Sequence, residues 1–167
     1  MNIRPPNRVT HTYTQRLVAP PAAVFPLLCP VREADWIDGW NPLVVLSHSG
    51  LAEPDCVFVT GAEPHDAVWF ITRHEPERGF VEMIKVTPEV TACKLTVQVR
   101  AAGSGSVADV TYSHTSLGPQ GDVFVASKEK SAELAKDLGA CAVEMEGAAV
   151  AQLCYQRGVG CLVIRSI

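Results

Sequence analysis

The chain has 167 residues, of which 47% are hydrophobic and 19% charged, and its formal net charge is −4 at neutral pH. This apolar content suffices for a packed core and excludes an intrinsically disordered chain. The negative charge balance, without a basic stripe of interleaved aromatics, argues against a nucleic-acid partner, and no apolar run approaches the roughly 18 residues of a membrane span.

The cysteines and histidines predict neither a disulfide framework nor a metal site. The six cysteines are scattered without a C-x-x-C pair, and the five histidines include no pair at i,i+4 spacing. We interpret the cysteines as small buried hydrophobes of a protein in the reducing cytoplasm. The N-terminal sequence lacks the apolar segment of a secretory signal, which favours the same location. We expect no cofactor.

The first part of the chain predicts one strand and two short helices. Residues 9–19 are rich in Thr, Tyr and Val and end at two prolines, which is typical of a strand and its terminus. Residues 22–28 carry apolar side chains at helical spacing, and residues 31–36 form a second short helical run after a proline. A loop that contains two tryptophans follows.

Six strand-like runs come next, separated by short segments rich in turn residues. Residues 91–101 alternate most regularly, with Leu95, Val97 and Val99 on one face and polar side chains on the other, as in a strand that half-faces a core. Consecutive strands with short connections predict an antiparallel meander. The expected strands are residues 43–48, 56–61, 67–74, 80–87, 91–101 and 108–116.

Several short sequences within this region point to one family. They are Val18-Ala19-Pro20 at the start of the first helix, Val24-Phe25-Pro26-Leu27-Leu28, Glu33-Ala34-Asp35-Trp36 with Gly39-Trp40, and Ala108-Asp109-Val110-Thr111-Tyr112 with Thr115. On these residues the chain from 9 to 120 resembles the START/Bet v1-like (SRPBCC, polyketide cyclase/dehydrase-like) superfamily. The resemblance implies an α+β helix-grip fold, a curved antiparallel sheet around a C-terminal helix with an apolar pocket between them.

The large side chains on or near the concave face of such a sheet are candidates for lining the ligand cavity. Core packing is the alternative for each of them. Two tryptophans in one loop often form a pocket mouth, which favours Trp36 and Trp40. The candidates are Phe25, Trp36, Trp40, Phe58, Trp69, Met83 and Tyr112.

No residue is assigned a catalytic role. Acid or base chemistry is available from a few polar side chains, but no two of them stand at a spacing that requires it. These side chains are Asp35, Glu82, Tyr112 and His114.

The C-terminal part of the chain follows a different pattern. Residues 128–138 are expected to form a helix, with Ser127 as its N-cap. A short apolar strand at 141–143, a helix at 146–157 and a continuous apolar strand at 161–164 then give a β–α–β order. This order predicts a parallel arrangement, which conflicts with the antiparallel meander before it.

The most specific motif of the chain is Val143-Glu144-Met145-Glu146-Gly147-Ala148-Ala149. On this motif, residues 121–167 resemble a truncated segment of the 5′-methylthioadenosine/S-adenosylhomocysteine nucleosidases, within the purine nucleoside phosphorylase superfamily. The resemblance implies that Met145 packs on a ribose whose 2′- and 3′-hydroxyls donate to Glu146, with Glu144 beside it. It also implies that Phe124 and Val125 border the purine and that Arg165 follows the next strand.

The nucleosidase pattern is incomplete. The family carries a Ser-Asp pair after Arg-x-Ile, whose aspartate protonates the leaving adenine, and a glutamate in its first half that activates water. This sequence has neither group, so we expect no nucleosidase activity from it.

Two organisations remain open. Residues 1–120 are expected as a ligand-binding domain and residues 121–167 as a nucleosidase-like fragment. In one organisation residues 123–138, continuing through 142–157, supply the C-terminal helix of the first domain; in the other the fragment is an appendage. A natural fusion, a frameshift and an engineered chimera each explain such a sequence.

The function expected from the sequence is the binding of a small hydrophobic or amphipathic ligand, with little or no catalysis. The alternative is a nucleosidase-family hydrolase fragment with a partial site for an adenosine-type nucleoside. A homo-oligomer also fits the sequence, because an unpaired strand at 161–164 would expose its edge.

Overall fold

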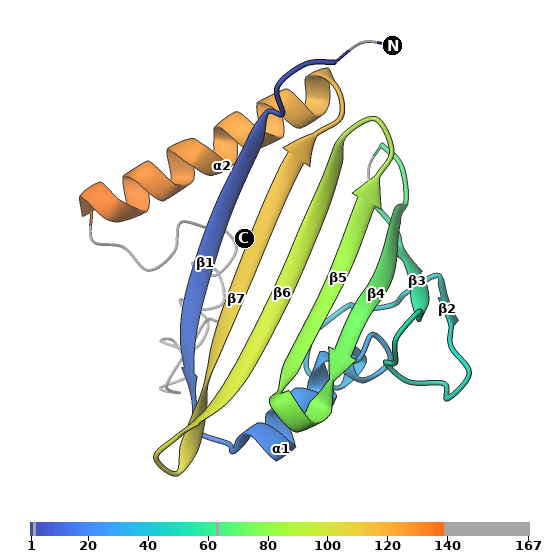
Figure 1. Ribbon diagram of the computed structural model, residues 1–167, viewed down its shortest axis with the longest axis vertical. Helices are drawn as coiled ribbons and strands as arrows, with labels where there is room; N and C mark the ends of the chain where they lie inside the picture. The colour runs from blue at the N-terminus through green and yellow to red at the C-terminus, as the bar shows by residue number, and fades with distance from the viewer. Residues whose placement is uncertain (2, 63, 139–167) are drawn as a thin grey trace, which may run out of the picture. The chain divides into compact units, whose positions relative to one another are not determined.

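The computed structural model describes residues 1, 3–62 and 64–138. The chain divides into two compact units, Met1–Ala126 and Ser127–Ile167, and the first contains one seven-stranded antiparallel sheet with the order β1-β7-β6-β5-β4-β3-β2 (Figure 1). The strands are β1 (Arg8–Leu17), β2 (Val44–Leu46), β3 (Val57–Thr60), β4 (Ala67–Glu75), β5 (Phe80–Thr87), β6 (Thr91–Ala102) and β7 (Gly105–Ser116). The helical segments are α1 (Pro21–Val24), the 3-10 turns η1 (Phe25–Leu28), η2 (Arg32–Asp35) and η3 (Pro76–Arg78), and α2 (Pro119–Leu138).

The order of these elements confirms the predicted antiparallel meander and the helix-grip α+β fold. From β2 to β7 each strand pairs with the next strand in sequence, and β1 pairs with β7. The first predicted helix is split into α1 and η1, because Pro26 lacks the N–H that a continuous α-helix would need there. The second predicted helix is the single 3-10 turn η2.

The last strand begins earlier than predicted. Residue Gly105, expected in a turn, already pairs with Ala102 across the β6–β7 hairpin, and Gly103 occupies the left-handed region at φ +60°. A Cβ atom on Gly105 would lie 2.1 Å from the carbonyl oxygen of Leu17. Gly105 therefore allows β7 to approach β1 closely. The sequence pattern indicated a turn at this position instead, because glycine is common in turns.

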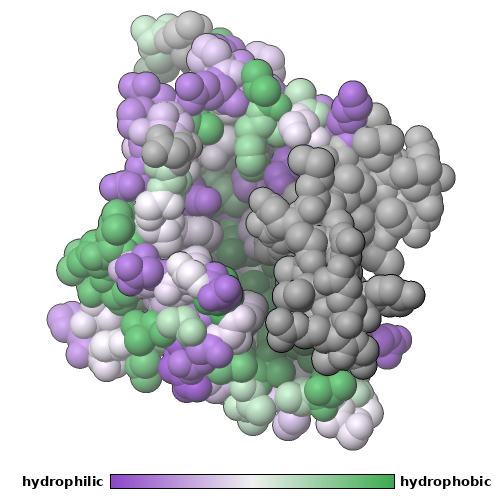
Figure 2. Space-filling view, turned by 180° about the vertical axis from the view of Figure 1, so that it is seen from behind, coloured by the Kyte–Doolittle hydropathy of each residue, from purple (hydrophilic) through white to green (hydrophobic). Residues whose placement is uncertain are grey.

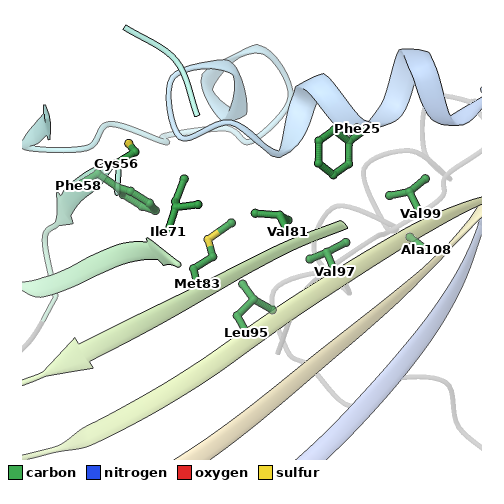
Figure 3. Packing of buried hydrophobic residues seen from close by; sticks show 10 residues of the cluster. All are labelled: Phe25, Cys56, Phe58, Ile71, Val81, Met83, Leu95, Val97, Val99 and Ala108. Carbon is green, nitrogen blue, oxygen red and sulfur yellow. The ribbon is translucent and has the colours of Figure 1, made fainter. Parts of the chain in front are cut away.

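One face of the sheet, called here the inner face, carries a closed hydrophobic core. Val81 and Met83 of β5 lie opposite Val97 and Leu95 of β6, and all four are buried. Ile71 of β4 continues this layer, and Figure 3 shows the ring of Phe25 approaching it from the opposite side. Burying side chains of this size stabilises the fold by about 1.5–3 kcal/mol each.

The other, outer face is polar over β1 and β7. Cross-strand hydroxyl pairs connect Thr10 to Ser113 at 2.9 Å and Thr12 to Thr111 at 2.8 Å. Such pairs stabilise neighbouring strands on a solvent-exposed face.

The helix after the sheet begins at Pro119, so the predicted start at residue 128 is wrong. Proline is favoured in the first turn of a helix, and the Asp122 carboxylate accepts a 2.7 Å hydrogen bond from Asn7 Nδ2. A Cβ atom on Gly121 would lie 1.9 Å from the carbonyl oxygen of Val90, so the first turn packs directly on the β5–β6 connection. This contact between distant residues starts the helix ahead of the expected Ser127 cap.

The helix expected over residues 123–138 is confirmed as part of α2. The β–α–β order expected after it, and the nucleoside-site candidates Glu144, Met145, Glu146 and Arg165, lie outside the described residues. Among the helices that the structure describes, none is long and apolar enough to cross a membrane.

Candidate ligand site on the inner face of the sheet

A single row of side chains crosses all seven strands on the inner face. The strand registers place its members directly opposite one another in turn. We call it the inner row, and from β2 to β1 it consists of Val45, Phe58, Trp69, Lys85, Cys93, His114 and Val9.

Aromatic stacking and a cation build the middle of the inner row. The rings of Phe58 and Trp69 are stacked, with centroids 5.3 Å apart and planes within 9°. The Trp69 indole N–H donates to Thr60 Oγ1 at 3.0 Å, which fixes the ring. Lys85 Nζ lies 5.0 Å from the Trp69 ring centroid, within the range of a cation–π interaction.

On the other side of Lys85 the inner row continues with Cys93 and His114. Cys93 Sγ lies 3.9 Å from His114 Nε2, and the His114 ring meets the edge of Phe124 with centroids 4.9 Å apart. Tyr112 stacks in parallel with His114 at 5.8 Å, and Tyr13 meets Tyr112 edge-on at 6.4 Å. Rings from β1, β7 and the first turns of α2 thus adjoin one another on this face.

Burial shifts the titration of the two ionisable groups at the centre of the row. It lowers the pKa of Lys85, against a smaller opposing effect of the Cys93 thiol. It raises the pKa of Cys93 to about 11, although the Ser113 backbone and Lys85 act in the other direction. The thiol is therefore neutral at physiological pH, and burial disfavours the charged form of the lysine.

The inner face changes character along the strands. Toward α1 the residues are fully buried in the core, whereas Trp69, Lys85, Tyr112 and His114 are only half-buried. In Figure 2, which views the side opposite to that of Figure 1, hydrophobic residues are visible at the bottom of a hollow. Within the described residues the buried Nε2 of His11, next to Tyr13, has no hydrogen-bond partner.

Five of the seven residues predicted to line a cavity fall into two environments. Phe25, Phe58 and Met83 are buried in the core, and Trp69 and Tyr112 lie half-buried on the inner face. Their role in lining a ligand cavity stays a prediction.

The two loop tryptophans are held by hydrogen bonds to backbone carbonyls. Trp40 is half-buried, and its indole N–H donates to the Pro30 carbonyl at 2.6 Å. Trp36 donates to the Leu27 carbonyl at 3.0 Å but is 52% exposed.

Sequence reasoning missed Lys85 and Cys93 as members of the site. The signal was present, because strict alternation in β5 puts Lys85 on the same face as Val81 and Met83. A lysine at an inward position is unusual enough to be singled out.

The polar side chains considered for acid or base chemistry are dispersed. Tyr112 and His114 share the inner face, while Glu82 lies on the outer face, where it accepts a 2.8 Å hydrogen bond from Thr72. Asp35 pairs with Arg32 at 2.6 Å on the exposed turn η2. In the same turn, burial raises the pKa of the Glu33 carboxyl to about 7.

The two nucleoside-site candidates within the described residues lie in the first turns of α2. Phe124 contacts the His114 ring, and Val125 is fully buried. Their assignment to a purine stays a prediction. No group of three or more potential metal ligands occurs in the part of the chain that the structure describes.

Known structures share the fold of this chain. A truncated norcoclaurine synthase from Thalictrum flavum superposes with a TM-score of 0.59 over 84% of this chain and 95% of that one, at 14% identity. Likeness at this identity shows the START/Bet v1 helix-grip fold.

Two sequence relatives match shorter stretches of the chain. Over 47 residues the chain is 55% identical to an aminodeoxyfutalosine nucleosidase of Helicobacter pylori, which covers 28% of this chain and 20% of that protein. Over 72 residues it is 39% identical to a 5′-methylthioadenosine/S-adenosylhomocysteine nucleosidase of Thermotoga maritima, which covers 40% and 33%. The chain thus spans only a fifth to a third of the length of these relatives.

The family model of the phosphorylase superfamily matches residues 82–167. The match begins inside β5, so that most of β5 and the whole of β6 and β7 lie within it. By this match over half of its length, the chain belongs to the phosphorylase superfamily.

Proposed function

We propose that this chain binds a small apolar or amphipathic molecule against the inner face of its sheet, with little or no catalysis. The observation that carries the proposal is the contrast in burial on that face. A closed core at one end gives way to half-buried rings of Trp69, Tyr112 and His114 at the other. Large aromatic surfaces that converge without complete burial are typical of small-molecule sites.

The chemistry of the face suits binding better than reaction. The pKa of Cys93, raised to about 11 by burial, leaves very little thiolate nucleophile at neutral pH. The carboxylates of Asp35 and Glu82 are engaged elsewhere, in contacts with Arg32 and Thr72. Stacked rings offer apolar contact area with few degrees of freedom to lose on binding.

Native mass spectrometry of the purified chain is the first test. A co-purifying small molecule supports the proposal, and the same spectrum reports whether the chain forms a homo-oligomer. Titration with the neutral fluorophore N-phenyl-1-naphthylamine then measures affinity directly.

A matched pair of variants places the bound fluorophore. Tyr112→Leu is expected to weaken its binding about three- to tenfold, since an aromatic partner is lost. The control Thr111→Ala changes the adjacent residue on the outer face and should leave affinity within about twofold, because the Thr111 hydroxyl pairs there with Thr12 on the face opposite to the proposed site. Equal effects of the two variants, or no binding to the wild type, would contradict the proposal.

A second candidate is a partial nucleoside site in a hydrolase-family fragment. The 55% identity over 47 residues to a nucleosidase favours it. Its residues are Phe124, Val125, Glu144, Met145, Glu146 and Arg165. Binding of an adenosine analogue that Glu146→Ala abolishes would support this site, and we expect no adenine release from methylthioadenosine above the level of that variant.

A further inference from the structure

We propose that the ligand of the inner face is an amphipathic anion, with a planar apolar body and an oxyanion group such as a carboxylate that pairs with Lys85. This inference rests on the proposed ligand-binding function and specifies the chemical class of the ligand.

The first observation that supports this inference is the position of Lys85 in the sheet. It is the cation at the centre of the inner row, with Trp69 as its cross-strand partner on one side and Cys93 on the other. Neighbouring residues along a strand point to opposite faces of the sheet. Lys94, the residue after Cys93 in β6, points to the outer face, where its Nζ lies 4.0 Å from Glu82 Oε2. The charge of Lys85 therefore lies on the face that carries the core.

The second step is that Lys85 has no acidic partner among the residues that the structure describes. The ion pairs among the described residues join other side chains, and Lys85 takes part in none of them. Its cross-strand partners are Trp69, whose indole ring it approaches, and Cys93, whose thiol has a pKa raised to about 11. A half-buried cation without a counter-ion is costly, and a ligand oxyanion would offset that cost.

The third step is the shape of the surface around this charge. Parallel rings flank it, Phe58 on Trp69 to one side and Tyr112 on His114 to the other, with planes within 9° and 2°. Flat apolar surfaces beside a cation fit a planar ring system that bears one anionic group.

Two probes with the same aromatic skeleton test the inference. 1-Anilinonaphthalene-8-sulfonate carries an oxyanion, and N-phenyl-1-naphthylamine lacks it. Both are titrated into the full chain and into Lys85→Met, Lys85→Arg and the outer-face control Lys94→Met. Thermal unfolding of each variant shows that it is folded, and Lys85→Gln replaces Lys85→Met if the latter does not fold.

The expected result is selective. Loss of the Lys85 charge should weaken binding of the sulfonate about tenfold and leave the neutral probe within about twofold. Lys85→Arg should retain most of the sulfonate affinity, and Lys94→Met should change neither probe.

Two different failures are distinguishable. If the neutral probe binds the wild type but Lys85→Met leaves sulfonate binding unchanged, or weakens both probes equally, the anionic ligand class is wrong and the proposed function stands. If neither probe binds the wild type, the proposed function itself is wrong.

Discussion

Lys85 and Trp69 are direct cross-strand partners, and the lysine Nζ lies 5.0 Å from the centroid of the indole ring. The same ring stacks on Phe58 on the neighbouring strand. This relationship makes Trp69 the link between the apolar half of the inner row and its cation.

Replacing Trp69 by leucine should therefore cost more than the loss of one hydrophobic contact. It removes the stacking on Phe58 and the cation–π contact with Lys85, and we expect unfolding free energy to fall by about 2 kcal/mol. Urea unfolding measures the loss. The control Trp36→Leu, at a residue that is 52% exposed, should cost clearly less, and equal losses would show that the Trp69 contacts add little.

The start of α2 should tolerate no side chain at Gly121. A Cβ atom there would lie 1.9 Å from the Val90 carbonyl oxygen, so Gly121→Ala is expected to destabilise the fold by about 2–4 kcal/mol. Gly61→Ala is the matched control, because a Cβ atom at Gly61 meets nothing within 4 Å. Chemical denaturation of both variants decides the point, and a wild-type midpoint for Gly121→Ala would contradict the tight contact.

Glu33 should make stability depend on pH below neutrality. Burial raises the pKa of its carboxyl from 4.5 to about 7, so the folded state binds the proton more tightly than the unfolded state. Its contribution is fully present below about pH 4.5 and is lost as pH rises through about 7, on the order of 3 kcal/mol.

Comparing the wild type with Glu33→Gln across that pH range isolates the effect. The variant should be more stable at pH 8 and lack this component of the pH dependence. Asp35→Asn, two residues away on the exposed turn, serves as the control. Parallel pH profiles of wild type and Glu33→Gln would refute the assignment.

Cys93 should resist alkylation in the folded protein. Its side chain is 2% exposed and its pKa is raised to about 11, so roughly one thiol in a thousand is ionised at pH 8. Iodoacetamide labelling followed by peptide mass mapping should leave Cys93 unmodified in buffer and modify it in urea. Rapid labelling in buffer would mean that this part of the inner face opens readily.

Local pattern predicted the strands well where both faces are unambiguous. The alternation in residues 91–101 placed Leu95, Val97 and Val99 on one face, and all three are buried in β6. Local pattern predicted the element boundaries wrongly where a glycine allows two segments of the backbone to approach closely. Gly105 belongs to β7 and Gly121 to α2, because the contacts that require them come from Leu17 and Val90, which are distant in sequence.

The sequence by itself determined the order of the strands, their antiparallel connection and the two resemblances, because period-2 alternation, turn composition and motifs are local properties. Only the tertiary structure decided that Trp69, Lys85, Cys93 and His114 form one row. The residues that form a strand can be predicted from that strand alone, but which residues are neighbours across the sheet depends on the register. A shift of one residue in the register would turn every side chain of a strand to the other face. The hairpin turns and the burial of the core set that register jointly. The position of Lys85 at the centre of the candidate site could therefore be recognised only in the folded sheet.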